Sequence, residues 1–151
     1  MGNVAFISEV RIEREGGPVR RAYLPAEAEP VYYGAHGAVA EHYGYVPGEF
    51  RDHATTLDHV VGAAAGCLTG TFAGALKARG IDPTGLVGHA RGEIELDGKV
   101  LVIKRIHVSY SGVDVPADKR EAADRALATH QQACPVSRSI EAAIQVTTGW
   151  Q

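Results

Sequence analysis

The longest uncharged stretch of the chain, counting His as neutral, constrains the fold most: residues 59–76, HVVGAAAGCLTGTFAGAL. It lies within a segment, 55–79, whose pattern predicts one long helix, with Gly80 as the C-terminal cap. Much of the stretch is Gly, Ala and Thr, and the charged residues Asp58 and Lys77 bracket it closely. We therefore expect the buried central helix of a soluble protein and no membrane span.

Four glycines recur at every fourth position of this helix: Gly62, Gly66, Gly70 and Gly74. Each costs about 0.8–1.0 kcal/mol of helix stability relative to alanine, so the four together cost about 3–4 kcal/mol. Tight packing is the natural compensation, because a ridge without side chains lets another backbone approach closely. The partner is either a neighbouring helix or sheet of the same subunit or a helix of a second subunit, and the pattern leaves both open.

The N-terminal third is expected to be rich in strands. Residues 4–13 alternate loosely and are rich in Val and Ile, and residues 19–24 resume this pattern after the Gly-Gly-Pro break at 16–18. This arrangement predicts a first hairpin. Residues 32–45 carry aromatic and β-branched residues and predict further strand before the Pro-Gly pair at 47–48.

After the long helix, residues 91–96 and 100–110 alternate with period two and predict a second hairpin. Between them, Asp97 and Gly98 indicate a type I′ turn. Two helices and a last strand are expected to follow, at 117–132, 135–143 and 144–150. This order of elements indicates an α+β fold, with sheet packed on the long helix, and not a doubly wound parallel sheet.

Composition and charge exclude several classes of protein. The 151 residues are 45% apolar, which is typical of one globular domain, and we expect that domain to span residues 1–151. Lys and Arg (15) nearly balance Asp and Glu (18) and are scattered along the chain, so we expect no nucleic-acid partner. Residues 1–15 lack a basic region before an apolar run, so we expect no targeting peptide and a cytoplasmic protein.

The two cysteines, Cys67 and Cys134, are too few for a disulfide framework or a closed zinc site, but a pair can be catalytic. Cys67 lies on the long helix among small, uncharged residues, where a cysteine is usually an inert, buried thiol. Pro135 makes Cys134 the N-cap of the next helix. The backbone N–H groups and the helix dipole there would lower the thiol pKa, although a plain capping role fits equally well.

The seven histidines show no metal-binding spacing. His130 precedes Cys134 by four residues, but the helix that starts at Pro135 need not place the two side chains on one face. The sequence also lacks a glycine-rich phosphate loop, because the glycines between 62 and 74 lie inside a helix. We therefore expect no metal and no cofactor.

The sequence Ala-Cys-Pro-Val-Ser at 133–137, together with the Gly/Ala-rich helix that carries Cys67, resembles the osmotically inducible protein C and organic hydroperoxide resistance (OsmC/Ohr) family. The resemblance covers nearly the whole chain and is strongest at 55–76 and 130–140. It implies an OsmC-like fold in an intertwined homodimer. It also implies that Cys67 is the peroxide-attacking thiol and Cys134 the resolving thiol.

The resemblance implies a thiol peroxidase that acts on organic hydroperoxides in oxidative stress defence. The attacking thiolate becomes a sulfenic acid, the resolving thiol condenses with it to a disulfide, and a dithiol of the lipoyl type or a small thiol resets the pair. The cysteines are expected to lie within disulfide reach, with Cα atoms within about 7 Å or brought there by a small shift.

The residues that activate the thiolate depart from the family pattern. In the family, an arginine of the N-terminal β region stabilises the thiolate, and a glutamate ten residues before the first cysteine holds that arginine. Here Leu57 stands at that position and Asp58 is the nearest carboxylate. Asp58 also fits a capping box that begins at Thr55. The resemblance favours Arg20 and Arg21 jointly as the activating arginine.

Arg51, just ahead of the long helix, is the second choice for that arginine.

The alternative to a peroxidase is a catalytically weak protein of the same fold that binds a hydrophobic small molecule at the dimer interface.

Overall fold

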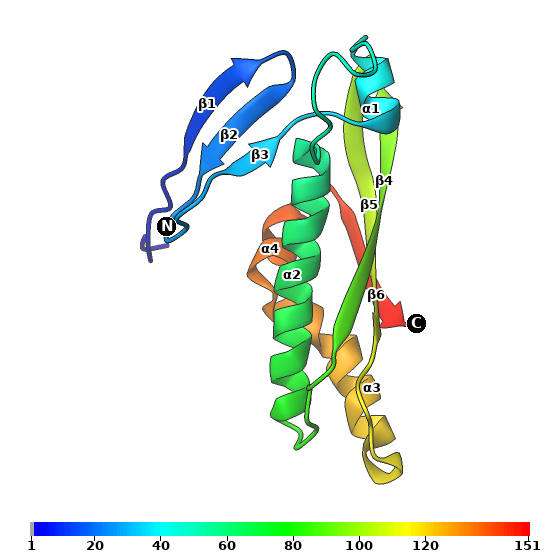
Figure 1. The fold of residues 1–151 in the computed structure, drawn as a ribbon. Helices are drawn as coiled ribbons and strands as arrows, with labels where there is room; N and C mark the ends of the chain where they lie inside the picture. Colours follow the sequence, from blue (N-terminus) through cyan, green and yellow to red (C-terminus); the bar gives the residue numbers. More distant parts are fainter. Residues whose placement is uncertain (1) are drawn as a thin grey trace. The chain divides into compact units, whose positions relative to one another are not determined.

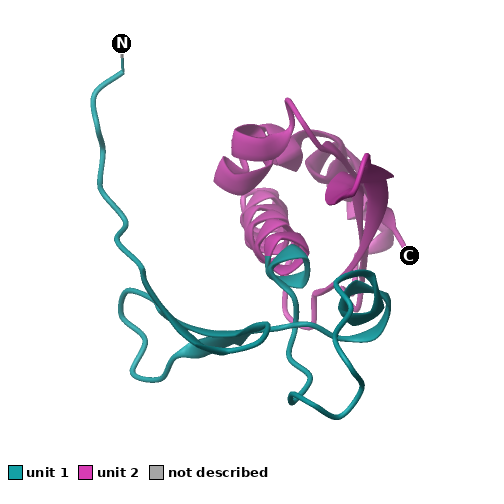
Figure 2. Ribbon diagram, turned by 90° about the horizontal axis from the view of Figure 1, so that it is seen from above, with its two compact units in different colours: residues 1–59 teal, residues 60–151 magenta. Residues whose placement is uncertain are grey.

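The computed structural model describes residues 2–151 and has the expected α+β fold, with two three-stranded sheets and four α-helices in the described residues (Figure 1). The chain divides into two compact units between His59 and Val60 (Figure 2). Each unit contains one of the two sheets. The single domain expected over residues 1–151 stays a prediction.

The sheet of the first unit is antiparallel, in the order β1 (Arg11–Gly16), β2 (Val19–Tyr23) and β3 (Val31–Tyr33). The predicted first hairpin is therefore confirmed, and its turn lies at 17–18. Gly17 is required there, because it has a φ of +52° and a Cβ on it would lie within 3.0 Å of the Phe50 ring.

The first strand is shorter than predicted. Residues 2–10 have no regular secondary structure, and Val4, Phe6 and Ile7 are 78%, 82% and 79% exposed. The alternation at 4–10 was expected to mark a strand, but β1 begins only at Arg11, where pairing with β2 starts. Apolar side chains on an extended segment do not make a strand unless a neighbouring strand takes up their backbone hydrogen bonds.

The prediction of strand over residues 32–45 is wrong beyond β3. A short helix, α1 (Gly37–His42), occupies the middle of this range. Gly37 opens it at a φ of +51°, and Gly44 closes it at +74°. The glycines that broke the β pattern in the sequence are thus the ends of a helical turn.

Helix α2 (Thr56–Lys77) confirms the long central helix, but it is not buried all round. Its buried side chains, at every fourth position, are Ala64, Leu68, Phe72 and Leu76. The four ridge glycines lie on an exposed face, and a Cβ on any of them would meet nothing within 4 Å in its unit. A partner for this ridge within the same unit is thereby excluded. By length and composition alone α2 could cross a membrane, as the core helices of many soluble proteins could.

The end of α2 is a Schellman motif at Gly80, as the sequence predicts. The Gly80 N–H donates to the Lys77 carbonyl over 3.0 Å, and the Ile81 N–H donates to the Leu76 carbonyl over 3.1 Å. Gly80 has a φ of +69°, which strains any residue with a Cβ.

The second unit is built on the sheet β4 (Val87–Asp97), β5 (Val100–Ser111) and β6 (Gln145–Trp150), in that order. β4 and β5 form the predicted hairpin, and β6 runs parallel to β5. The turn lies at 98–99, one residue later than predicted, and of its two residues only Gly98 has a positive φ (+62°). This is the pattern of a type II′ turn, so the predicted type I′ is wrong.

The helices of the second unit lie on one side of its sheet (Figures 1 and 2). Gly88 and Gly92 on β4 allow α2 to approach closely: a Cβ on either would lie within 3.0 Å of Thr69 or Val61 of α2. The glycines that a close packing contact requires are therefore on the strand, and not on the helix ridge.

The C-terminal helices are shorter than predicted. The expected helix at 117–132 is α3 (Arg120–Thr129), with 3₁₀ turns before and after it at Ala117–Lys119 and His130–Ala133. α4 (Pro135–Ile140) ends three residues before the predicted 143. The 3₁₀ turn after α3 leads directly into Cys134 and thus positions the start of α4.

We predict that Gly80→Ala lowers the free energy of unfolding by about 1–2 kcal/mol, because alanine is strained in the left-handed conformation that the Schellman motif requires. Urea denaturation followed by circular dichroism measures the loss. Lys119 Nζ lies 2.9 Å from the position of the new Cβ, so the same substitution in a Lys119→Ala chain is the control. If the loss disappears in that background, a clash and not backbone strain is its cause.

Candidate active site

Cys134 caps the N-terminus of α4, as the Cys-Pro pair predicts. Its backbone is extended, with φ -83° and ψ 114°, and Pro135 takes the first position of the helix. The Ser137 backbone N–H donates to Cys134 Sγ over 3.4 Å. The side chain is completely buried, with an exposed fraction of 0%. The sulfur therefore takes the place that a serine or aspartate oxygen usually has at an N-cap.

Burial raises the pKa of the Cys134 thiol above its usual value. The backbone N–H groups of Ser137 and Val136 lower that pKa, as expected at a helix start, but they do not offset the loss of hydration. A side-chain hydrogen bond with Cys67 and the charge of Cys67 raise the pKa further. Of the two roles that the sequence left open for Cys134, the lowered pKa at a helix start is therefore not found, and the capping role is.

Cys67 lies half-buried on α2, between the exposed Gly66 and the buried Leu68. Its carbonyl accepts a hydrogen bond from Thr71 Oγ1 over 2.9 Å, one turn further along the helix. Both cysteines are free thiols. Cys67 raises the pKa of the Cys134 thiol, but the two cysteines are not at disulfide distance. Bond formation between them stays a prediction, and it requires α2 and the start of α4 to move closer together.

A buried tyrosine and histidine form a hydrogen-bonded pair that the sequence did not single out. Tyr110 on β5 and His130 after α3 are joined by a hydrogen bond of 2.9 Å between Tyr110 Oη and His130 Nε2. Their exposed fractions are 1% and 2%. Burial raises the pKa of Tyr110, and the charge of Cys134 raises it further, so the phenol lies within electrostatic reach of the sulfur.

Aromatic rings enclose this pair. Phe72 of α2 lies with its ring centroid 4.4 Å from that of Tyr110, 4.9 Å from that of His130 and 5.4 Å from that of Trp150. The sequence signal was weak: Tyr110 continues the period-two pattern of its strand, and His130 stands four residues before Cys134. Only tertiary structure brings residues 20 positions apart into contact.

Asp58 forms the capping box at the start of α2. Its Oδ2 accepts hydrogen bonds from the Thr55 backbone N–H over 2.7 Å and from Thr55 Oγ1 over 2.8 Å, and the Asp58 N–H donates to Thr55 Oγ1 over 3.0 Å. His36 Nε2 lies 2.7 Å from the same carboxylate oxygen. Hydrogen bonds from His36 and Thr55 lower the pKa of Asp58, although burial opposes them. Within residues 2–151 no arginine is recorded as a partner of Asp58.

The two arginines that the family pattern favours lie next to each other on β2 and differ in their partners. Arg21 Nε lies 2.8 Å from a Glu15 carboxylate oxygen, and Arg21 Nη2 lies 3.6 Å from Glu13. The Nε atoms of Arg20 and Arg21 are both buried, and neither makes a hydrogen bond among the described residues. The two arginines differ in their ion pairs: Arg21 is paired with carboxylates of its own sheet, whereas no ion pair of Arg20 is recorded among the described residues.

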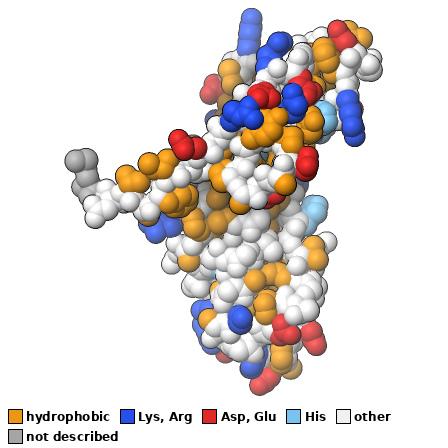
Figure 3. All heavy atoms as spheres, turned by 60° about the vertical axis from the view of Figure 1, so that its left-hand side comes forward, with side chains coloured by type: hydrophobic (Ala, Val, Ile, Leu, Met, Phe, Trp, Pro, Cys, Tyr) orange, Lys and Arg blue, Asp and Glu red, His pale blue; other side chains and the backbone are white. Residues whose placement is uncertain are grey.

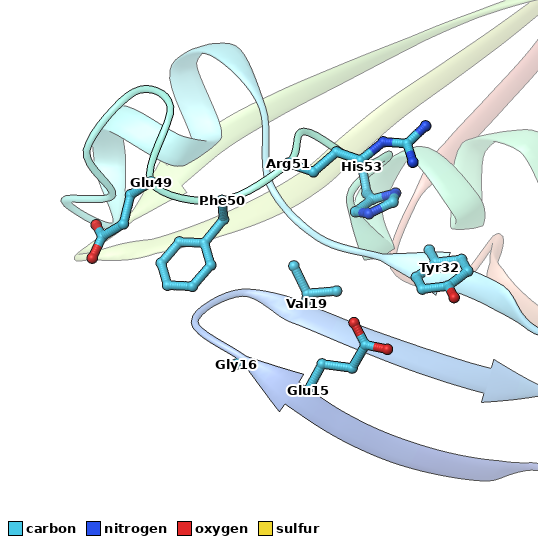
Figure 4. Close-up of a pocket in the computed structure, with 8 residues that line it drawn as sticks. All are labelled: Glu15, Gly16, Val19, Tyr32, Glu49, Phe50, Arg51 and His53. Atoms are coloured by element: carbon cyan, nitrogen blue, oxygen red, sulfur yellow. The ribbon is translucent and has the colours of Figure 1, made fainter.

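Arg51 lies in the loop before α2 and is exposed. It lines a cavity of about 800 Å³ in the first unit, which Figure 4 shows between the β1–β2 hairpin and this loop. The lining residues are Glu15, Gly16, Val19, Tyr32, Glu49, Phe50, Arg51 and His53. The rings of Tyr32 and His53 are stacked, with centroids 4.9 Å apart. The cavity has a mixed polar and apolar lining, and none of its lining residues is a cysteine.

Within residues 2–151, no three His, Cys, Asp or Glu side chains are grouped so that they could hold a metal ion. His107, for example, has its Nδ1 2.8 Å from Thr147 Oγ1, and His59 Nε2 lies 3.2 Å from the Tyr32 carbonyl.

Comparison with solved structures shows the same fold at low sequence identity. An organic hydroperoxide resistance protein OsmC from Legionella pneumophila is 12% identical, with 99% of each chain covered and a TM-score of 0.69. The organic hydroperoxide resistance protein OhrB of Bacillus subtilis is 14% identical, with 98% of this chain and 100% of that chain covered and a TM-score of 0.63. An OsmC-like protein from Mycoplasma pneumoniae is 10% identical, with 98% of each chain covered and a TM-score of 0.69.

No curated protein matches the chain. A model of the OsmC-like protein family does match it, over residues 50–149, a range that includes both cysteines, Asp58 and the Tyr110–His130 pair. The match covers more than half of the sequence, and the solved structures with the same fold include proteins of that family. This chain therefore belongs to the OsmC-like protein family.

Proposed function

We propose that the protein is a thiol-dependent peroxidase that reduces organic hydroperoxides through Cys67 and Cys134. Membership of the OsmC-like family supports a role in the response to peroxide or stress in general. The finer proposal rests on one observation: within the second unit, Cys67 is near enough to Cys134 to raise the pKa of the Cys134 thiol. Two thiols that interact in this way can be oxidised as a pair after a small movement.

Burial supports a division of roles between the two cysteines. Cys67 is half-buried and has glycine and alanine neighbours, which leave room for a bulky hydroperoxide. Cys134 is completely buried, so an external substrate cannot reach its sulfur without opening of the structure. Cys67 is therefore the thiol that attacks the peroxide, and Cys134 is the thiol that resolves the intermediate.

The reaction needs no metal or cofactor. The Cys67 thiolate attacks the distal peroxide oxygen, the O–O bond breaks, and the alkoxide leaves and takes a proton to become an alcohol. Cys67 is then a sulfenic acid. Cys134 loses its proton and forms an S–S bond with Cys67, while the S–O bond breaks and hydroxide leaves as water. A dithiol of the lipoyl type or a small thiol reduces the disulfide, which suits the reducing cytoplasm.

Arg20 is the arginine that we assign to activation of the Cys67 thiolate. No ion pair of Arg20 is recorded among the described residues, whereas Arg21 pairs with Glu13 and Glu15; the buried Nε of each arginine makes no hydrogen bond there. A buried donor without a partner is costly, and an anionic sulfur would satisfy it. The Asp58 carboxylate already accepts hydrogen bonds from Thr55 and lies 2.7 Å from His36 Nε2. We therefore do not assign Asp58 the role of holding this arginine.

The active form that we propose is a homodimer. The glycine ridge of α2 is exposed, although its glycines destabilise the helix, and the apolar side chains of Val4, Phe6 and Ile7 are also exposed. Figure 3 shows hydrophobic side chains uncovered along the segment next to the N-terminus. An apolar surface of this kind indicates a partner, and a second copy of the same chain supplies a matching ridge.

The alternative is a catalytically weak protein that binds a hydrophobic small molecule at the dimer interface. One observation favours it: the carboxylate that the family uses to hold the activating arginine is replaced by Leu57, and Asp58 beside it is engaged in the capping box. Loss of this anchor would leave the thiols in place and slow their chemistry.

The variants Cys67→Ser and Cys134→Ser should differ in kind. Cys67→Ser should abolish consumption of cumene hydroperoxide with dihydrolipoamide as reductant, because the attacking sulfur is gone. Cys134→Ser should consume about one equivalent and then stop or slow, with Cys67 trapped as a sulfenic or sulfinic acid. Turnover and peptide mass spectrometry measure the two effects. Wild-type turnover in Cys67→Ser would contradict the peroxidase proposal and favour the ligand-binding alternative.

Arg20→Ala should slow the first step, oxidation of Cys67, about ten- to a hundredfold, which corresponds to one or two pKa units of thiolate stabilisation. Stopped-flow measurement with one equivalent of hydroperoxide isolates this step. Arg21→Ala is the matched control, because it removes the same charge from the neighbouring position. Equal slowing in both variants would mean that Arg20 has no specific role.

Sedimentation should give about 32 kDa, twice the 16.0 kDa of one chain. Gly70→Ala and Gly74→Ala should weaken the dimer, because each methyl group keeps the partner away from the ridge. If the ridge instead faces water, each substitution should stabilise the protein by about 0.8–1.0 kcal/mol and leave its sedimentation unchanged. A monomer at micromolar concentration in the wild type would contradict the dimer proposal.

A further inference from the structure

Ser137 carries a buried hydroxyl group without a hydrogen-bond partner. The side chain is 0% exposed, and its Oγ bonds to no other group among the described residues. Such a hydroxyl is costly, because it loses its hydrogen bonds to water and gains none within the protein. Ser137 also contacts the proposed redox pair directly: it is the third residue of α4, and its backbone N–H donates to Cys134 Sγ over 3.4 Å.

Other helical hydroxyl groups of the chain avoid this cost in a uniform way. Each donates over 2.7–2.9 Å to the carbonyl four residues earlier, and these groups belong to Thr69, Thr71, Thr129 and Ser139. Ser139 lies two residues after Ser137 on the same helix and donates to the Pro135 carbonyl. The residue four positions before Ser137 is Ala133, which precedes α4, so the helix does not supply this acceptor.

The backbone groups of the N-cap residue are already in use. In a capping box, the side chain of the third helical residue reaches back to the N–H of the N-cap residue. Here that N–H, of Cys134, donates to the Gln131 carbonyl over 3.1 Å, and the Cys134 carbonyl accepts from the Arg138 N–H over 3.0 Å. The remaining polar atom of Cys134 is its sulfur, which changes its charge during the proposed reaction.

The backbone of α4 orients the Ser137 side chain toward this sulfur. The Cα–Cβ bond of a helical residue tilts toward the N-terminus of its helix, which here is the end that Cys134 caps. Rotation about that bond moves the hydroxyl and leaves the backbone in place. A thiol sulfur is a weak acceptor, whereas a hydrogen bond to a charged group is roughly twice as strong as one between neutral groups. The formation of a thiolate would therefore favour this rotation.

We propose that the Ser137 hydroxyl is a hydrogen-bond donor that serves the Cys134 thiolate during resolution, an inference that rests on the proposed peroxidase function. As the Cys134 sulfur attacks the sulfenic acid of Cys67, Ser137 Oγ turns and donates to the sulfur on which negative charge develops. The S–S bond forms, the Cys67 S–O bond breaks, and the departing hydroxide takes the Cys134 proton and leaves as water. Ser137 keeps its own proton throughout.

A donor of this kind compensates for the surroundings of Cys134. Burial raises the pKa of its thiol, the backbone N–H groups of Ser137 and Val136 do not offset that effect, and Cys67 raises the pKa further. The other titratable group that responds to Cys134 in the described residues is Tyr110, a buried phenol that supplies no positive charge. A rotating hydroxyl adds a third donor for the thiolate and places no permanent charge in the core.

Ser137→Ala tests the proposal first through stability, because it removes the hydroxyl and nothing else. Since that hydroxyl is unpaired in the reduced protein, the variant should be at least as stable as the wild type under reducing conditions. Urea denaturation followed by circular dichroism gives the midpoint of unfolding. A lower midpoint in Ser137→Ala would mean that the hydroxyl has a partner in the reduced protein, and it would overturn the proposal.

The second test separates the two steps of a single turnover with cumene hydroperoxide. In Ser137→Ala, oxidation of Cys67 should proceed at the wild-type rate, and formation of the disulfide should slow about tenfold, the equivalent of one pKa unit of thiolate stabilisation. The sulfenic acid should accumulate and react with dimedone. Ser139→Ala is the matched control, because its hydroxyl lies on the same helix and is already paired. Wild-type disulfide formation in Ser137→Ala, or equal slowing in both variants, would overturn the proposal.

A measurement without peroxide distinguishes failure of this inference from failure of the peroxidase proposal. If hydroperoxide leaves Cys67 unoxidised in the wild type, the proposed function fails, and Ser137 is still tested in a Cys67→Ser chain, where Cys134 is the one thiol. Methyl methanethiosulfonate reacts with the thiolate, so its rate of reaction as a function of pH reports the ionisation of Cys134.

Adding Ser137→Ala to the Cys67→Ser chain should move the midpoint of this pH profile upward by about one unit, with equal rates at the alkaline limit. Adding Ser139→Ala should leave the profile unchanged. An unchanged midpoint in the Ser137→Ala chain would overturn the proposal. The same factor of slowing at every pH would also overturn it, because the hydroxyl would then affect access of the reagent to the sulfur and not the thiolate.

Discussion

The close approach of α2 to the sheet of the second unit is the constraint on which the rest of the structure depends. Gly88 and Gly92 leave space on β4 for α2 side chains, and a Cβ on either would lie within 3.0 Å of them. The apolar stripe of α2 is then buried, and Phe72 reaches the rings of Tyr110 and His130. Cys67 on α2 is then near enough to Cys134, at the start of α4, to raise its pKa.

Burial then decides what each thiol can do. The start of a helix normally favours a thiolate, but Cys134 is so fully desolvated that its pKa is raised despite two backbone N–H groups. Cys67 is only half-buried on α2, so its sulfur is more accessible to a substrate than that of Cys134. This difference in burial can provide one thiol that a substrate reaches, Cys67, and one thiol that reacts only with an internal partner, Cys134.

Several elements could be predicted from local sequence because their causes are local. The extent of α2, the Gly80 cap, both hairpins and the N-cap position of Cys134 follow from an uncharged stretch, turn residues and a Cys-Pro pair. The remaining features depend on tertiary contacts. Residues 4–10 alternate like a strand but lack strand pairing, the pKa of Cys134 depends on desolvation, and Tyr110 meets His130 across 20 positions of sequence.

The central claim is that Cys67 and Cys134 act as one redox pair. Peptide mass spectrometry under non-reducing conditions, after one equivalent of organic hydroperoxide, tests it most directly. The account predicts an intramolecular disulfide between the two cysteines, with little sulfinic or sulfonic acid at Cys67. Overoxidised Cys67 with no disulfide to Cys134 would contradict it.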